Sequence, residues 1–173
     1  MVAAAKRGRL LHALFERLPA LIPEQRRAAG AQWLASEGAD AGLVDVALKV
    51  IDNPQFSGIF VSDALAEAPL AGVVDGVVIA GTVDRLSVSE TMVEIVDFKT
   101  GRRVPEDASA IPVAHLRQMA AYVAVLEGIF PGRGIKAALL YSEGPKLHYL
   151  TPELLELHKP GFATEQDNLL PTG

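Results

Sequence analysis

Two carboxylates and one amine are the side chains of this sequence best suited to chemistry. Asp97 and Lys99 stand at the end of the apolar, β-branched run Met92–Phe98, and a strand there would place both side chains on one face. Asp84 lies in the preceding β-branched run, Val77–Val88. An antiparallel pairing of the two runs would bring Asp84 beside Asp97. Adjacent carboxylates repel each other unless something positive lies between them, so we expect a divalent cation here.

A hard cation such as Mg²⁺ suits this set, because it takes oxygen ligands from one or two carboxylates, from water and from substrate phosphates. With Lys99 next to the metal, a water can be oriented or deprotonated, and the charge that develops on a phosphate can be neutralised. Hydrolysis of a phosphodiester is the reaction that these parts favour. The spacing of Asp97 and Lys99 is weak support by itself, since an Asp near a hairpin is most often a turn or solvated residue.

The elements that must position these residues follow from hydrophobic periodicity and turn residues. Apolar spacing predicts helices over about residues 6–18, 23–38 and 40–51, with Asp40 as the cap of the third. A hairpin should turn at Asp75-Gly76, and the next strand is Met92–Phe98. A long helix over about 113–130, strands over 135–141 and 146–150, and a short helix from Thr151 complete the chain. This order predicts an α/β (α+β) fold, a central mixed β-sheet flanked by helices.

Composition limits the class of protein. The chain has 173 residues, of which 50% are hydrophobic and 21% charged, which predicts a single folded domain over residues 1–160 with a flexible tail over 161–173. Without cysteine it has no disulfide, thiolate zinc site or iron–sulfur cluster. The longest apolar stretch, residues 70–80, is interrupted and too short for a membrane span, so we expect a cytoplasmic location.

Charge is unevenly distributed along the chain. The formal net charge is −5, yet residues 1–30 carry six basic and two acidic residues, whereas residues 31–100 carry three and eleven. Two of those eleven acids are Asp84 and Asp97, whose charge a bound cation would offset. The acidic total therefore does not exclude a nucleic-acid partner.

Five short motifs occur in one order along the chain. They are Gly8-Arg9-Leu10-Leu11-His12, Glu67-Ala68-Pro69, Gly81-Thr82-Val83-Asp84, Ile95-Val96-Asp97-Phe98-Lys99-Thr100 and Gln118-Met119-Ala120-Ala121-Tyr122. Together, over about residues 7–150, they resemble the RecB-type branch of the PD-(D/E)XK nucleases, and most closely the C-terminal nuclease domain of AddA helicase–nucleases. The "PD" element reads Val83-Asp84, so its proline is missing while its carboxylate is kept.

The resemblance implies a role for each motif residue. It makes Lys99 the catalytic lysine and places Gln118 and Tyr122 as a pair that positions the active site and the DNA. Glu67 is expected beside the metal site. The implied metal ligands, for Mg²⁺ or Mn²⁺ in its place, are His12, Asp84, Asp97 and the Phe98 backbone carbonyl. Arg102, Arg103 and Arg117 are candidates for contacts with DNA phosphates, although solvated charge is the commoner role for such residues.

The resemblance also implies a function and partners. It predicts an exonuclease-type DNA nuclease that degrades single strands unwound by attached helicase domains during double-strand-break repair by homologous recombination. An AddB-type subunit would be the partner in a heterodimer. No phosphate loop of the Gly-x-x-x-x-Gly-Lys-Ser/Thr type occurs, so ATP hydrolysis would belong to other domains of a longer polypeptide. The missing cysteines separate this chain from the related AddB nuclease domain, which carries an iron–sulfur cluster.

Two other interpretations remain open at the level of sequence. A non-catalytic module of the same fold would only guide DNA or hold a partner subunit, but such copies typically lose a carboxylate or the lysine, and this chain keeps Asp84, Asp97 and Lys99. A nuclease of the same fold that serves a phage or a plasmid would have no helicase domain attached.

Overall fold

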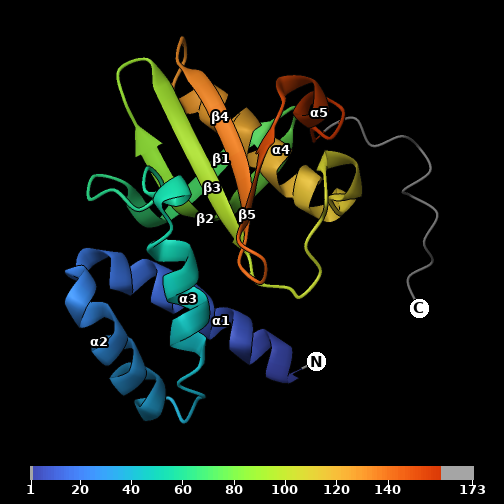
Figure 1. The fold of residues 1–173 in the computed structure, drawn as a ribbon. Coiled ribbons are helices and arrows are strands. Elements are labelled where there is room, and N and C mark those ends of the chain that lie inside the picture. The colour runs from blue at the N-terminus through green and yellow to red at the C-terminus, as the bar shows by residue number, and fades with distance from the viewer. Residues whose placement is uncertain (1, 161–173) are drawn as a thin grey trace.

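A five-stranded mixed sheet forms the centre of the molecule (Figure 1). The computed structural model describes residues 2–160, so the predicted tail over 161–173 lies outside the described residues. The strands follow one another across the sheet in chain order, and only β3 and β4 are parallel. They are β1 (Leu65–Val74), β2 (Val77–Val88), β3 (Met92–Lys99), β4 (Gly134–Tyr141) and β5 (Lys146–Leu150). Parallel neighbours need a long crossover, and the helix α4 (Val113–Ile129) supplies it.

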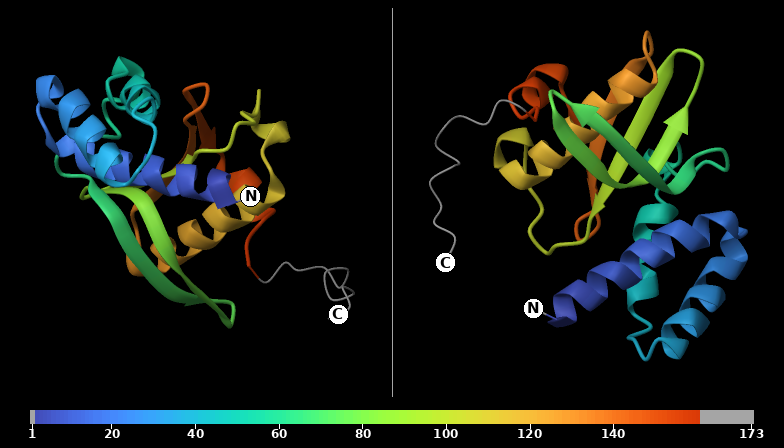
Figure 2. Two further views of the ribbon diagram at one scale, coloured as in Figure 1. Left: turned by 90° about the horizontal axis from the view of Figure 1, so that it is seen from below. Right: turned by 180° about the vertical axis from the view of Figure 1, so that it is seen from behind.

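Helices cover both faces of the sheet, as the mixed-sheet prediction requires (Figure 2). One face carries α1 (Val2–Arg17), α2 (Pro23–Ser36) and α3 (Leu43–Ile51), and the other carries α4 and α5 (Pro152–Glu156). Within residues 2–160, no helix is both long and apolar enough to cross a membrane.

Strand alternation divides the apolar side chains between two cores. On β3, Ile95 packs in the cluster under α4, whereas Val96 and Phe98 pack in the cluster under α1–α3. Phe15 of α1 meets Phe98 with ring centroids 4.8 Å apart, and both rings are buried. Since each fully buried large side chain contributes about 1.5–3 kcal/mol, each core fixes its helical layer against the sheet.

Most element predictions are confirmed, and the differences have local causes. The hairpin turns at Asp75 (φ 48°) and Gly76 (φ 79°), the two left-handed residues that a tight hairpin turn needs. Helix α1 begins at Val2 rather than near Lys6, because the intervening alanines favour a helix. The prediction that Asp40 caps the third helix is wrong: Gly42 is the cap residue, and the Asp40 side chain accepts from the Gly42 N–H at 2.8 Å in the turn before it.

One close approach in the sheet leads to a first prediction. A Cβ on Gly81 would lie 2.2 Å from the Tyr122 hydroxyl oxygen and 2.8 Å from Cζ, so no larger residue fits without displacing that buried ring. We expect Gly81→Ala to lower the free energy of unfolding by about 1–3 kcal/mol, measured by urea denaturation.

The matched control is Gly128→Ala on α4, where a Cβ would meet no atom within 4 Å. Because alanine favours a helix over glycine, this variant should gain about 0.5–1 kcal/mol of stability. A Gly81→Ala protein as stable as the wild type would contradict the packing described for Tyr122.

Candidate active site

Asp84 occupies the point where β2 and β3 separate. The ladder between these strands begins at Arg85 opposite Val96, and in that register the next residues, Asp84 and Asp97, lie next to each other. Beyond this point a side-chain hydrogen bond joins the two strands: Asp84 Oδ2 accepts from the Phe98 N–H at 2.5 Å. Asp84 is 7% exposed and Asp97 5%. The structure thus brings together two buried carboxylates, as the antiparallel pairing predicted.

Helix α1 crosses the ends of the strands and carries His12 into this site. The guanidinium of buried Arg85 donates to the Phe15 carbonyl at 2.7 Å, and Arg7 donates to the Thr100 carbonyl at 3.3 Å. His12 lies between Arg7 and Phe15 on the helix, and its Nδ1 is 3.0 Å from Asp84 Oδ1. These contacts on either side of His12 fix the imidazole beside the carboxylate.

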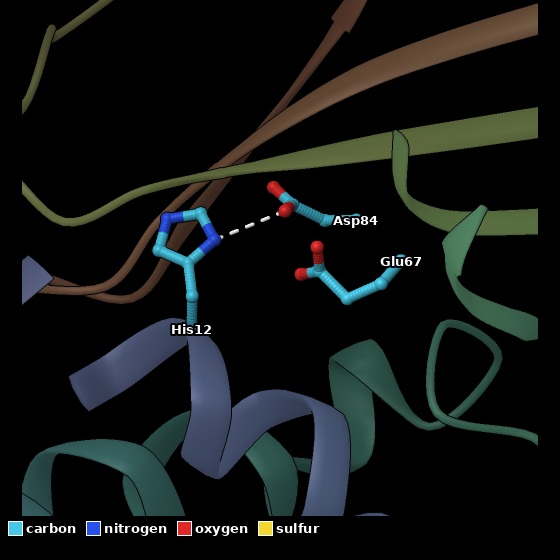
Figure 3. A group of neighbouring side chains, drawn as sticks. All are labelled: His12, Glu67 and Asp84. Atoms are coloured by element: carbon cyan, nitrogen blue, oxygen red, sulfur yellow. Dashed lines mark hydrogen bonds and ion pairs between the residues drawn. The ribbon is translucent and has the colours of Figure 1, made fainter. Parts of the chain in front are cut away.

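The side chain of Glu67 reaches the site from β1, where the backbone is irregular (Figure 3). Its φ of 50° is left-handed, a conformation that side-chain-bearing residues rarely adopt within a strand. Its neighbours Ala66 and Ala68 pair with β2, and Glu67 between them directs its carboxylate towards His12 and Asp84. One ligand atom from each of these three residues lies within 4.8 Å of the others.

The pKa values in the site reflect an excess of negative charge. Burial raises the pKa of Asp97, and the Asp84 charge raises it further against the opposing effect of Lys99. Burial and the Asp84 charge also raise the pKa of Glu67. Burial lowers the pKa of His12, but the hydrogen bond to Asp84 and the surrounding carboxylates outweigh that effect and raise it above 6.5. A cation would relieve this repulsion.

Lys99 is held on the α4 side of the site. Its Nζ lies 2.7 Å from Asp97 Oδ2 and donates to Gln118 Oε1 at 2.7 Å. Gln118 Nε2 in turn donates to the Tyr122 hydroxyl at 3.4 Å, one helical turn further along α4. The half-buried ammonium therefore has a fixed position next to the carboxylates.

Most of these groups line one open cleft of about 440 Å³, but Glu67 and Tyr122 do not. Its lining consists of His12, Thr82, Asp84, Asp97, Phe98, Lys99, Thr100, Gly101, Arg103, His115, Gln118 and Tyr141. A second hollow of about 450 Å³, which includes Arg9 and Glu67, shares His12 and Thr100 with the first. His12 thus stands between two cavities.

The remaining predicted residues lie at different distances from this cleft. Arg103 lines it, whereas the exposed side chains of Arg102 and Arg117 do not. The Phe98 N–H is engaged by Asp84, and the role of the Phe98 carbonyl as a metal ligand stays a prediction. Sequence reasoning missed His115 and Tyr141 as lining residues. Tyr141 had one usable signal, a polar residue that ends a buried strand; nothing in the pattern distinguishes His115.

Comparison with known proteins identifies the family of the chain. A family model described as the PD-(D/E)XK nuclease superfamily matches residues 1–168, and the chain belongs to that superfamily. A solved structure titled "Crystal structure of SSO0001" is similar at a TM-score of 0.38 and 15% sequence identity, over 86% of this chain and 80% of that one. No curated protein matches the sequence.

The residues present fit a divalent cation of the kind that such nucleases use. An imidazole nitrogen and two carboxylates converge, and burial together with the Asp84 charge raises the pKa values of Glu67 and Asp97. Carboxylate-rich sets of this kind suit hard cations such as Mg²⁺ and Mn²⁺.

Replacing Glu67 by glutamine should separate metal binding from folding. Without metal, we expect Glu67→Gln to unfold at the wild-type temperature or above it, because burial and the Asp84 charge both disfavour the ionised side chain. In Mn²⁺ its gain in stability should be smaller, by about 1.4 kcal/mol for each tenfold loss of affinity at saturating metal. Thermal unfolding with and without Mn²⁺ measures this, with the exposed turn residue Glu90→Gln as the control. If Mn²⁺ stabilised Glu67→Gln as much as Glu90→Gln, Glu67 would not be part of the metal site.

His115, which also lines the cleft, should make the stability of the protein depend on pH. Burial and the Lys99 charge lower the pKa of His115 below 6.5 in the folded protein. The unfolded chain therefore binds this proton first, so stability is lost as the pH falls from about 6.5 through the folded-state pKa, with a slope of at most about 1.4 kcal/mol per pH unit.

The variant His115→Gln lacks this titration. Relative to it, the wild type should lose stability between pH 7.5 and 5.5, measured as free energies of urea unfolding at both pH values. A difference between the two proteins that does not change with pH would contradict the lowered pKa.

Proposed function

We propose that this chain is a divalent-metal-dependent deoxyribonuclease domain that hydrolyses phosphodiesters. The observation that carries the proposal is the fixed position of Lys99, which contacts Asp97 and Gln118 and lines the same cleft as His12 and Asp84. These last two residues form, with Glu67, a group that could hold a metal ion. Membership of the PD-(D/E)XK nuclease superfamily supports the same chemistry. A half-buried ammonium beside convergent carboxylates suits phosphate hydrolysis.

The chain's own residues divide the chemical work. His12, Asp84 and Asp97 would hold the cation, with Glu67 beside them. When bound, the cation would withdraw charge from the phosphate and favour deprotonation of water. Lys99 donates hydrogen bonds from a position that Asp97 and Gln118 restrain, so it can orient the attacking water and stabilise the phosphate oxygens. Water adds to phosphorus, the bond to the leaving sugar oxygen breaks, and that oxygen takes up a proton.

The proposed substrate and partners rest on the resemblance that the five ordered motifs carry. The proposed substrate is single-stranded DNA at unwound ends, cut in exonuclease fashion during homologous recombination. The similarity to AddA nuclease domains supports a polypeptide with helicase domains attached to this one and an AddB-type subunit as partner. In that setting the motor delivers strand to the cleft and raises its local concentration, so the domain alone should be a slow enzyme.

Cleavage assays with matched variants test the activity. Labelled single-stranded DNA should be degraded in Mg²⁺ or Mn²⁺ and remain intact in EDTA. Asp97→Asn and Lys99→Ala should each lower the rate at least about 100-fold, which corresponds to about 2.7 kcal/mol of transition-state stabilisation.

The control is Asp75→Asn at the exposed hairpin turn, where asparagine tolerates the left-handed backbone. It should cleave like the wild type. Binding of DNA without any metal-dependent cleavage by the wild-type protein would favour the non-catalytic module instead, and cleavage that survives Asp97→Asn would exclude the proposed site.

A further inference from the structure

A histidine–tyrosine pair, in which the tyrosine is buried and the histidine half-buried, forms the part of the cleft that the proposed hydrolysis does not use. His115 lies in the first turn of α4, and its Nδ1 is 3.0 Å from the hydroxyl of Tyr141 at the end of β4. The parallel register places Tyr141 beside Lys99, and both His115 and Tyr141 line the same cavity as Lys99. Tyr141 is only 1% exposed, so its ring is part of the core, and its hydroxyl is hydrogen-bonded to His115.

The pair has a defined proton arrangement. Burial and the Asp97 charge raise the pKa of Tyr141 to about 12, so the hydroxyl keeps its proton at neutral pH. Within residues 2–160, His115 is the acceptor available to that hydroxyl. A buried O–H without an acceptor is unfavourable, so Tyr141 donates to Nδ1 of His115. The imidazole is neutral at this pH because its pKa is lowered, and its own proton then resides on Nε2, which makes Nε2 a donor.

The surroundings of His115 favour an anion as the ligand. Arg103 lines the same cleft with an exposed guanidinium, and Lys99 and the Gln118 amide lie on the same side. The nearest carboxylate of the cleft, Asp97, is already paired with Lys99. Lys99 and Tyr141 are register partners on β3 and β4, and Asp84 stands one strand further away, on β2.

We propose that His115, oriented by Tyr141, and Arg103 form a phosphate-binding subsite that holds a phosphate of the nucleic-acid strand beside the one that is cleaved. The inference rests on the proposed nuclease function for the identity of the strand. The ligand chemistry is a phosphodiester within the strand or a phosphate monoester at its end. His115 acts here as a binding and positioning residue, with no part in bond breaking.

The two members of the subsite should differ in their response to salt. A cationic Arg103 displaces counterions from DNA, so Arg103→Ala should reduce the slope of log affinity against log salt by about 0.7 for a single strand. A neutral His115 displaces none, so His115→Ala should weaken binding about tenfold while the slope stays unchanged. His115→Gln keeps a donor and should recover part of the loss, and Tyr141→Phe should weaken binding less than His115→Ala.

The experiment is fluorescence anisotropy of a labelled single-stranded oligonucleotide with the full chain in EDTA at pH 7.5, where no cleavage occurs. His158→Gln, a substitution in the turn after α5 and outside the cleft, is the control and should bind like the wild type. Oligonucleotides with a 5′-phosphate, a 3′-phosphate or neither distinguish the two phosphate sources. A His115 effect on all three identifies an internal phosphodiester, and an effect on one phosphorylated end alone identifies a terminal phosphate.

Cleavage kinetics in Mg²⁺ supply a second readout. His115→Ala should raise KM with little change in kcat, whereas a loss of kcat at unchanged KM would overturn the positioning role. Wild-type affinity of His115→Ala in EDTA, for a variant that melts at the wild-type temperature, would also overturn the subsite. An inactive wild-type protein whose DNA binding still depends on His115 would refute the nuclease function and leave the phosphate subsite in place.

Discussion

The burial of negative charge where β2 and β3 separate is the constraint on which the rest of the structure depends. Asp84 and Asp97 lie nearly out of solvent beside each other, which would be strongly unfavourable if each were not matched by a donor or a charge. The Phe98 N–H donates to Asp84, whose other carboxylate oxygen contacts His12, and Lys99 forms an ion pair with Asp97. With Glu67, three carboxylates face one ammonium and one imidazole, so the site is short of positive charge, which gives a cation a reason to bind.

Both helical layers contribute to this one point of the sheet. Helix α1 brings His12 from one face, and α4 brings Gln118 from the other, although the two helices pack in separate cores. Alternation along β3 makes this possible, since Phe98 anchors the α1 side while Asp97 and Lys99 face α4. Asp84 lies where the β2–β3 ladder ends, so its side chain can contact both His12 and the Phe98 N–H.

Local patterns predicted those features that depend on neighbours in sequence. The alternation of Asp97 and Lys99, the Asp75-Gly76 turn and the apolar faces of the helices are of this kind, and the elements were found with small shifts at their ends. Features that depend on tertiary contact were beyond reach. The left-handed backbone of Glu67 and the pairing of His115 with Tyr141 arise only when distant segments meet. The roles of the motif residues came from resemblance to a family, because spacing alone does not distinguish a catalytic Asp from a solvated one.

The sequence separation of 72 residues between His12 and Asp84 has a consequence for the behaviour of the chain as it folds and opens. The hairpin and β3 can form from contacts close in sequence, whereas docking of α1 must wait for β2 and closes a long loop. A cation that bridges His12 to the sheet binds only the docked state, so metal and docking stabilise each other. Local opening of the α1–α3 layer would therefore separate His12 from Asp84 while the sheet persists, and a cation bound between them would hold that layer to the sheet.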